Sequence, residues 1–495
     1  MELDHDTCYR ALASRDVRFD GRFFIAVKTT RIYCRPICPA RTAKSENVLF
    51  LPTAAAAQEA GFRPCLRCRP EAAPDSGAWR GVSNTGVSNT VARALALIEM
   101  GALDDSGMDA LTERLGVGDR QLRRLFAQHL GASPVTVAQT RRVLLAKQLI
   151  HETSMPLTEI AFAAGFGSIR RFNEVFQDLF QRPPSALRHG SQPEQSAQAG
   201  VTLLLRYRPP YDWPAVLAHL SARAITGLEL VADGCYYRTI NLDGVHGTLV
   251  VQQGVGKALK VTIRFPRLSS LPAIIARLRR MFDLAADPEI INSQLSTDSL
   301  MAKLTAARPG LRVPGAWDGF ELAMRAVLGQ QITVAAAIKL ASKLVAQYGE
   351  ALSEPSADRP GLTHVFPQAA RVAEADLAAL GMPKARAATL SAVAAALVAD
   401  PQLLDTGASL EEAVLKLRAL PGIGDWTAQY IALRHLREPD AFPAADVALM
   451  HAIAVHEGVR PNAKELAARA ETWRPWRAYA AQHLWSSLVW AGYIL

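Results

Sequence analysis

The stretch of residues 420–446 constrains the fold of this chain most. It begins Leu-Pro-Gly-Ile-Gly and continues through a mostly apolar, helix-like run to Phe-Pro-Ala-Ala-Asp. Gly422 and Gly424 flank a single aliphatic residue, so the backbone can turn sharply and present bare N–H groups at the start of a helix that we expect over residues 425–433. Such a turn suits a DNA phosphate.

Asp446 stands directly before the apolar run of residues 447–454, in an N-cap-like position. There the helix dipole and the free N–H groups favour the ionised carboxylate. Short glycine motifs and capping aspartates are each common in proteins. Taken singly, the glycine motif is more simply interpreted as a turn between two helices, and Asp446 as a helix cap. Together they place a carboxylate near a hairpin that can bind the DNA backbone.

This combination resembles the helix-hairpin-helix DNA glycosylases, in which a catalytic aspartate follows the hairpin at about this spacing. Trp-Asp-Gly-Phe-Glu at residues 317–321 and Gly-Gln-Gln at 329–331 look like the alkylated-base glycosylases of the AlkA type, over residues 200–495. The resemblance implies that Asp446 is catalytic. It also implies that the glycines of the hairpin, Gly422 and Gly424, bind DNA.

The same resemblance implies a pocket for an alkylated base, formed by Trp426, Tyr430 and Trp485, with Gln331 at the place of the residue that wedges into the duplex. That residue is apolar in some relatives. Trp426 and Tyr430 are four residues apart and so share one helical face. An N-alkylated purine is cationic and already a good leaving group, so Asp446 alone could stabilise the developing sugar cation or orient water. The base must first leave the duplex, and aromatic rings suit a cation.

Two absences refine this expectation. Lyase-type members of the superfamily carry a lysine at the position held here by Trp426, so we expect a monofunctional glycosylase. No cysteine follows Cys235, so we expect no iron–sulfur cluster.

Four of the six cysteines form two close pairs. Three residues separate Cys34 from Cys38, and two separate Cys65 from Cys68. In a reducing compartment this spacing favours one tetrahedral Zn²⁺ over disulfides. The zinc is either purely structural or it activates a thiolate. Arginines crowd the ligands and could hold DNA phosphates against such a thiolate: Arg31, Arg35, Arg41, Arg63, Arg67 and Arg69.

This cysteine region, with Arg-Ile-Tyr-Cys-Arg-Pro-Ile-Cys-Pro-Ala-Arg at residues 31–41 and Gly-Phe-Arg-Pro-Cys-Leu-Arg-Cys at 61–68, resembles the methyl-acceptor domain of the Ada regulators. The resemblance implies that all four cysteines bind zinc and that Cys34 takes a methyl group from a DNA phosphotriester. Spacing alone does not choose between Cys34 and Cys38.

A repeated helical pattern follows. Residues 109–115 and 119–130, and again 157–164 and 168–180, predict two helix-turn-helix units joined by a long helix at 135–151. The pair resembles the DNA-binding domain of AraC-type regulators, although a helical bundle without DNA contacts has the same periodicity. Polar and basic side chains that we expect to face a major groove are Arg120, Arg123, Arg124, Arg170, Arg171 and Asn173.

The predicted fold is multidomain and mainly α with α+β parts. At 495 residues the chain can bury several cores. Alternating apolar and polar residues over 201–266 predict a small α/β sheet subdomain, and the pattern from 271 onward predicts an all-helical region. Linkers are expected over 70–90 and 189–200. The resulting domains are 1–75, a zinc methyl acceptor; 88–190, the double helix-turn-helix; 200–285, the sheet subdomain; and 286–495, the glycosylase core.

Charge and targeting patterns are compatible with this reading. A net charge of +9 permits a nucleic-acid partner. The sequence starts without a signal-peptide pattern and contains no apolar run of membrane-spanning length, so we expect a cytoplasmic protein with no membrane partner. The resemblances imply double-stranded DNA, both alkylated sites and promoter, and RNA polymerase as partners. They imply alkylation repair combined with transcriptional regulation; the alternative is a regulator whose C-terminal half only binds DNA.

Overall fold

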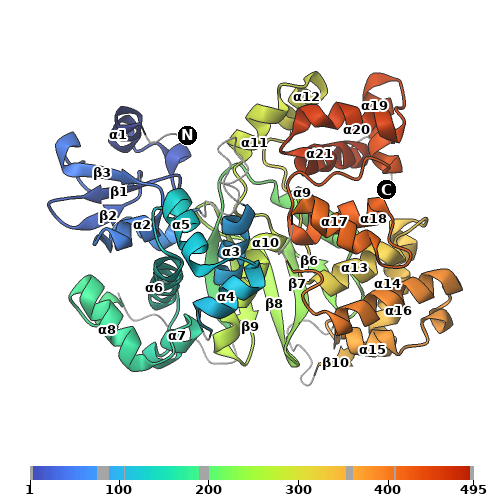
Figure 1. The fold of residues 1–495 in the computed structure, drawn as a ribbon, viewed down its shortest axis with the longest axis horizontal. Helices are drawn as coiled ribbons and strands as arrows, with labels where there is room; N and C mark the ends of the chain where they lie inside the picture. Colours follow the sequence, from blue (N-terminus) through green and yellow to red (C-terminus); the bar gives the residue numbers. More distant parts are fainter. Residues whose placement is uncertain are drawn as a thin grey trace. The chain divides into compact units, whose positions relative to one another are not determined.

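The computed structural model describes residues 4–74, 89–104, 106–188, 200–352, 361–405 and 409–490 (Figure 1). The chain divides into two compact units. Unit 1 comprises residues 1–207 with 267–276, and unit 2 comprises 208–266 with 277–495. Most of both predicted linkers, residues 75–88 and 189–199, lies outside the described residues.

Unit 1 begins with a small sheet in the strand order β3-β1-β2-β4. Its strands are β1 Phe24–Val27, β2 Ile32–Cys34, β3 Val48–Leu51 and β4 Arg63–Pro64. Alternate residues of β1 pack on opposite sides, Ile25 in the cluster that contains helix α1 (His5–Ser14) and Ala26 in the cluster that contains α2 (Ala54–Glu59). Short 3-10 helices connect these elements: η1 Val17–Phe19, η2 Ser45–Asn47 and η3 Pro70–Ala72.

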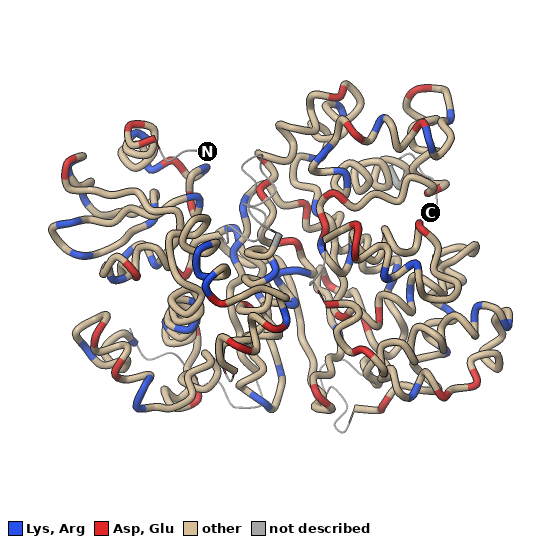
Figure 2. Tube along the Cα trace, in the orientation of Figure 1, with Lys and Arg blue, Asp and Glu red and all other residues tan. Residues whose placement is uncertain are grey.

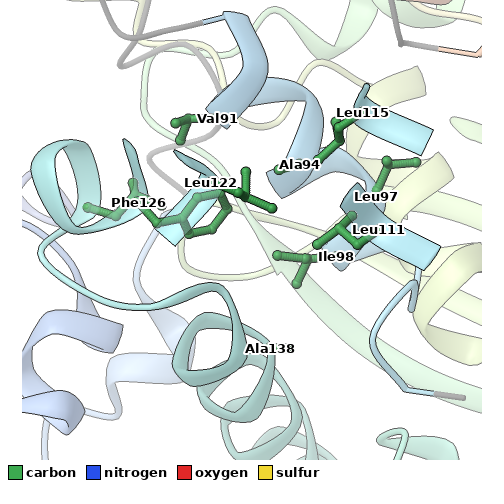
Figure 3. Close-up of a cluster of buried hydrophobic side chains, with 10 residues drawn as sticks. Val91, Ala94, Leu97, Ile98, Leu111, Leu115, Leu122, Phe126 and Ala138 are labelled. Carbon is green, nitrogen blue, oxygen red and sulfur yellow. The ribbon is translucent and has the colours of Figure 1, made fainter. Parts of the chain in front are cut away.

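The rest of unit 1 is helical and confirms both predicted helix-turn-helix units. Its elements are α3 Asn89–Glu99, α4 Met108–Leu115, α5 Asp119–Leu130, α6 Pro134–Glu152, α7 Leu157–Ala163, α8 Ile169–Phe180, η5 Pro184–Leu187, strand β5 Val201–Arg206 and η7 Leu268–Ser270. Figure 3 shows the core of the first helix-turn-helix, where Leu97 and Ile98 of α3 meet Leu111 of α4 and Leu122 of α5. Burying this shared face fixes α5 relative to α3 and α4.

Helix α6 is tied to the cysteine region by a buried ion pair. The Nζ of Lys147 donates to Glu71 Oε2 at 2.7 Å and to the carbonyl oxygen of Cys65 at 3.0 Å. Both charged side chains are almost fully buried. On the other side of Glu71, Arg69 donates to Glu71 and also pairs with Glu152 at the end of α6. The loop that carries two of the cysteines is therefore held against the helix that connects the two helix-turn-helix units.

Unit 2 contains an antiparallel sheet with the order β9-β8-β7-β6. Its strands are β6 Glu229–Ala232, β7 Cys235–Leu242, β8 Val245–Gln253 and β9 Ala258–Arg264, and helix α9 spans Trp213–Ser221. The predicted combination of strands with one helix is confirmed.

Helices make up most of the remainder of unit 2. Their bounds are α10 Leu271–Met281, which begins in unit 1, α11 Pro288–Leu295, α12 Ser299–Ala307, α13 Gly319–Leu328, α14 Val334–Tyr348, α15 Ala369–Ala373, η8 Leu377–Leu380, α16 Lys384–Ala399, α17 Leu410–Arg418, α18 Asp425–Ile431, η9 Ala432–Leu436, α19 Val447–Glu457, α20 Ala463–Ala470, η10 Glu471–Trp473 and α21 Arg477–Trp490. One detail departs from the expected all-helical pattern. Two-residue strands β10 (Glu350–Ala351) and β11 (His364–Val365) pair with each other.

The structure confirms a multidomain, mainly helical fold with small sheets. In Figure 2, Lys and Arg are interspersed with Asp and Glu along both units. Among the described helices, none combines the length and apolar character needed to cross a membrane.

Candidate functional site

The predicted hairpin joins α17 to α18. Gly422 has a φ of +79°, and a Cβ at this residue would collide with the side chain of Thr389. Gly424 is the N-cap residue of α18, and a Cβ there would meet no atom within 4 Å. The chain at Gly424, where α18 begins, therefore faces open space. Asp425, which would repel a phosphate, forms an ion pair with Arg418 at 3.6 Å.

Asp446 is the N-cap residue of α19, as predicted, and only 8% of it is exposed. Its Oδ1 accepts hydrogen bonds from the Leu449 backbone N–H at 2.9 Å and from the indole N–H of Trp485 at 3.1 Å. Its Oδ2 accepts from the indole N–H of Trp426 at 2.6 Å. Three donors therefore fix the orientation of the carboxylate.

The three predicted pocket aromatics lie together beside Asp446. The rings of Trp426 and Tyr430 stack, with centroids 5.2 Å apart and planes at 10°, and Trp485 meets Tyr430 edge-on at 6.4 Å. All three side chains are partly exposed, whereas Trp473 and Trp476 are 0% and 4% exposed in the core. Because the rings of Trp426 and Tyr430 stack on each other, they form one aromatic wall rather than two opposing ones.

Sequence reasoning missed Arg434, which lies behind this wall. Helix α18 continues into the π-helical turn η9, where Arg434 is 4% exposed. Its Cζ lies 5.6 Å from the Tyr430 ring centroid and 5.2 Å from that of Trp485, and its Nη1 donates to the carbonyl oxygen of Pro314 at 2.9 Å. Arg434 follows Tyr430 by four residues and Trp426 by eight, and this same-face spacing was the available signal.

The predicted wedge residue, Gln331, lies between α13 and α14. It is exposed and has a φ of +57°. Sequence reasoning missed its neighbour Gln330, whose Nε2 donates to the Gly422 carbonyl oxygen and to Thr427 Oγ1, both at 3.1 Å. Arg386 in turn donates to the Gln330 carbonyl oxygen. The loop that carries Gln331 is thereby fixed to the hairpin.

The four predicted metal ligands converge in unit 1. The Sγ atoms of Cys34, Cys38, Cys65 and Cys68 all lie within 4.8 Å of one another. Four thiolates at this separation fit tetrahedral Zn²⁺, whose Zn–S bonds are about 2.3 Å long. Cys38, Cys65 and Cys68 are only 5%, 5% and 7% exposed, whereas Cys34 is half-buried. Cys34 is thus the most accessible of the four.

Two of the six arginines near the cysteines have acidic partners inside the fold. The Arg35 side chain pairs with Asp20, and the Arg69 side chain with Glu71. These two side chains therefore have a structural role in the fold, and their expected contact with DNA phosphates stays a prediction. Three of the others, Arg31, Arg41 and Arg67, are exposed.

The six predicted groove-facing residues lie on α5 and α8, the second helices of their units, and all are exposed: Arg120, Arg123, Arg124, Arg170, Arg171 and Asn173. Some of their charge is paired within the helix. Arg123 lies 2.9 Å from Asp119, and Glu174 lies 2.8 Å from Arg170 and 3.8 Å from Arg171.

Four protein-family models match the chain in succession. They are the metal binding domain of Ada at residues 7–71, a helix-turn-helix domain at 111–190, the AlkA N-terminal domain at 202–318 and the HhH-GPD superfamily base excision DNA repair protein at 324–478.

Some relatives match the whole chain, and others match only part of it. The probable bifunctional transcriptional activator/DNA repair enzyme AlkA of Mycobacterium tuberculosis is 43% identical over 493 residues, which covers 99% of this chain and 97% of that protein. DNA-3-methyladenine glycosylase 2 of Escherichia coli is 36% identical over 58% of this chain and 97% of its own length. The solved 3-methyladenine DNA glycosylase of Archaeoglobus fulgidus shares the fold, with a TM-score of 0.52 at 21% identity, covering 58% of this chain and 98% of that one.

Proposed function

The chain belongs to the family of bifunctional AlkA/Ada-type transcriptional activators and DNA repair enzymes, and we propose which of its residues carry each activity. It combines DNA repair with transcriptional regulation, and it joins a DNA-3-methyladenine glycosylase to an Ada-type methyl-acceptor domain.

Asp446 is the catalytic carboxylate of base release. The observation that carries this assignment is a mostly buried carboxylate, oriented by Leu449 and two indole N–H groups, beside three partly exposed aromatic rings. As the N-glycosidic bond breaks, its electron pair leaves with the base and the sugar C1′ becomes cationic. Asp446 stabilises that cation, and water then adds its oxygen to C1′ and gives up a proton.

The wall of Trp426 and Tyr430, with Trp485 edge-on to it, receives the flipped base. Stacking on an aromatic wall recognises alkylated bases by shape and, for cationic bases, by charge. Since position 426 holds tryptophan, no amine is available there for a Schiff base with the sugar, and the glycosylase is monofunctional. The exposed backbone at Gly422 and Gly424 binds a DNA phosphate, and Gln331 fills the gap that the flipped base leaves.

Cys34 accepts a methyl group, and its four-cysteine cluster holds one Zn²⁺. Bound zinc keeps the sulfurs deprotonated and fixes their geometry. The Cys34 Sγ attacks the methyl carbon of a phosphotriester, the methyl C–O bond breaks, and a phosphodiester anion leaves. The greater exposure of Cys34 supports this choice over Cys38, Cys65 and Cys68.

The regulatory part reads DNA through α5 and α8. Arg120, Arg123 and Arg124 on α5 enter one major groove, and Arg170, Arg171 and Asn173 on α8 enter the next. RNA polymerase is the partner through which binding alters transcription.

We place the domain limits at 1–75, 88–190, 200–285 and 286–495. The family matches support the first domain, since one covers 7–71, and the end of the second, since another covers 111–190. The match to the AlkA N-terminal domain runs on to residue 318.

The full chain incubated with N-alkylated duplex DNA tests the assignment of the glycosylase half. We expect free base in solution and an intact strand at the resulting abasic sites until alkali is added. Strand cleavage without alkali would contradict the monofunctional mechanism. Absence of free base would favour a regulator whose C-terminal half only binds DNA.

A further inference from the structure

The methyl-acceptor domain is hydrogen-bonded to the turn between α5 and α6. The hydroxyl of Thr53, the N-cap residue of α2, donates to the carbonyl oxygen of Leu130 at 2.8 Å. The backbone N–H of Ser133, the N-cap residue of α6, donates to Glu59 Oε2 at 2.8 Å. Helix ends leave such backbone groups without partners inside the helix. Helix α2 therefore supplies partners at the end of α5 and at the start of α6.

The end of α5 is also closely packed against α2. Gly131, the C-cap residue of α5, has a φ of +68°, and a Cβ at this residue would lie 3.1 Å from the Cβ of Ala56. That separation is shorter than the 3.5–4.0 Å at which carbon atoms normally meet, so no side chain fits between the two helices here. The glycine thus lets α2 lie directly against the end of α5.

Cys34 is connected to this contact through a single core. Its neighbour Tyr33 is 0% exposed and shares a buried cluster with Ala54 and Ala57 of α2. The Tyr33 hydroxyl also accepts a hydrogen bond from Gln58 Nε2 at 3.0 Å. Cys34, the next residue along β2, faces the other side of the strand and is half-buried. Because close-packed interiors resist displacement, the position of Cys34 is fixed relative to α5.

The second recognition helix, α8, lacks this connection. Within the described residues, its charged side chains interact with its own turns, as Arg170 and Arg171 do with Glu174. No hydrogen bond among the described residues joins α8 to residues 4–74. The methyl-acceptor domain is therefore hydrogen-bonded to one of the two recognition helices, α5.

We propose that the methyl-acceptor domain and α5 form one DNA-reading body, in which Thr53 and Glu59 hold Cys34 opposite a single backbone phosphate that flanks the half-site read by α5. This inference rests on the proposed roles of Cys34 as methyl acceptor and of α5 and α8 in reading DNA. The domain then contributes to promoter choice, because it meets the backbone at a fixed offset from α5. The unmethylated Cys34 thiolate repels that one phosphate, and methylation removes the repulsion there.

A scan of the DNA backbone tests this offset. The promoter is selected with the methylated protein, and in each duplex one phosphate is replaced by a neutral methylphosphonate, which carries no transferable methyl group. The measured quantity is the ratio of Kd for the unmethylated full chain to Kd for the methylated one. On the unmodified promoter we expect a ratio of about fivefold, as for one partly exposed charge pair. At a single position the ratio should fall to about one, because the unmethylated protein gains affinity there.

The location of this phosphate is the decisive result. Half-sites are assigned from the base pairs whose substitution no longer matters in Arg120→Ala, on α5, or in Arg171→Ala, on α8. We expect the phosphate beside the α5 half-site. A ratio that falls gradually over many positions, or beside the α8 half-site, would overturn the proposal, and so would a ratio near one on the unmodified promoter. A protein that accepted no methyl group at Cys34 would instead overturn the proposed function.

Variants of the two hydrogen bonds test the positioning role of Thr53 and Glu59. The double variant Thr53→Val with Glu59→Ala removes both bonds, while the Lys147–Glu71 ion pair still holds the domain on α6. We expect the single position to spread over several phosphates, with the methyl group still found on Cys34 by mass spectrometry. Thr53→Ser with Glu59→Gln keeps a hydroxyl and an acceptor oxygen and should keep the single position.

Ser133→Ala is the matched control. It removes the side-chain cap of α6, which accepts from the Thr136 N–H, but keeps the backbone N–H that donates to Glu59. The turn is thereby weakened without loss of the connection, so the single position should remain. A single position retained in the double variant, or an equal spread in Ser133→Ala, would overturn the positioning role of Thr53 and Glu59.

Discussion

At the scale of single residues, the site depends on hydrogen bonds that the sequence did not reveal. The pattern predicted that Asp446 caps a helix and that Trp426 shares a face with Tyr430. It did not show that the indoles of Trp426 and Trp485 both donate to Asp446. These residues come from different helices, and only packing brings them together. Trp426 thus serves both as a stacking surface and as a donor.

Replacing Trp426 separates these two roles. Trp426→Phe keeps an aromatic face but loses the N–H group, and since hydrogen bonds to charged groups contribute about 1.5–3 kcal/mol, we expect base release to fall by roughly ten- to a hundredfold. Trp426→Ala also loses stacking, worth about 1–3 kcal/mol, with a larger loss on cationic lesions than on uncharged ones. Single-turnover base release on both lesions measures this. Equal losses on the two lesions would indicate plain packing.

At the scale of elements, the helix bounds were largely predictable from the sequence, whereas the strand pairings and hydrogen bonds between elements were not. Helical periodicity and flanking glycines located α4, α5, α7 and α8 to within a residue or two. The strands of the cysteine region and the pairing of β10 with β11 carried no clear periodic signal because they are only two to four residues long. Gln330 forms hydrogen bonds with Gly422 and Thr427, which are distant from it in the sequence, so sequence periodicity could not predict these contacts.

Gln330→Ala tests this anchor. The change removes hydrogen bonds to the Gly422 carbonyl oxygen and to Thr427, so the loop bearing Gln331 should lose its fixed position relative to the hairpin. We expect kcat/KM on duplex DNA to fall about tenfold, as for the loss of one or two hydrogen bonds of about 1 kcal/mol each. Release from single-stranded DNA, which needs no wedge, should change little. An equal fall on both substrates would show that the anchor only stabilises the fold.

Lys147 and Glu71 offer a second test at this scale. Lys147→Met leaves the buried Glu71 carboxylate with Arg69 alone, and we expect unfolding of unit 1 to become easier by about 3 kcal/mol. The double variant Lys147→Met with Glu71→Gln removes both charges and should recover part of that loss. Denaturant unfolding monitored in the full chain measures both. A double variant less stable than the single one would contradict a charge-pairing origin.

At the scale of the whole molecule, methylation of Cys34 should act as a switch for DNA binding. It converts a thiolate into a neutral thioether, so one negative charge disappears near DNA phosphate. We expect the methylated protein to bind promoter DNA more tightly, with a difference that shrinks as salt rises because such charges are screened over about 10 Å at moderate salt. Promoter duplexes can be selected from random sequences with the methylated protein.

The switch has two readouts. Affinity is measured before and after exposure to methylphosphotriester DNA, at two salt concentrations, and Cys34→Ser should gain nothing. Mass spectrometry of the exposed protein should find the methyl group on Cys34. Unchanged affinity, or a methyl group on Cys38, Cys65 or Cys68, would show the switch to be wrong.

We propose above that Asp446 supplies the charge that releases the base, and one pair of variants tests this role directly. Asp446→Asn keeps the size of the side chain and removes the charge, whereas Asp425→Asn removes an exposed charge from the nearby hairpin helix without touching the pocket. The measurement is single-turnover base release from alkylated duplex DNA, with binding to the same DNA recorded in parallel. We predict that Asp446→Asn releases base about 100- to 1000-fold more slowly while binding is retained, and that Asp425→Asn is close to normal. Near-normal release by Asp446→Asn would contradict the account.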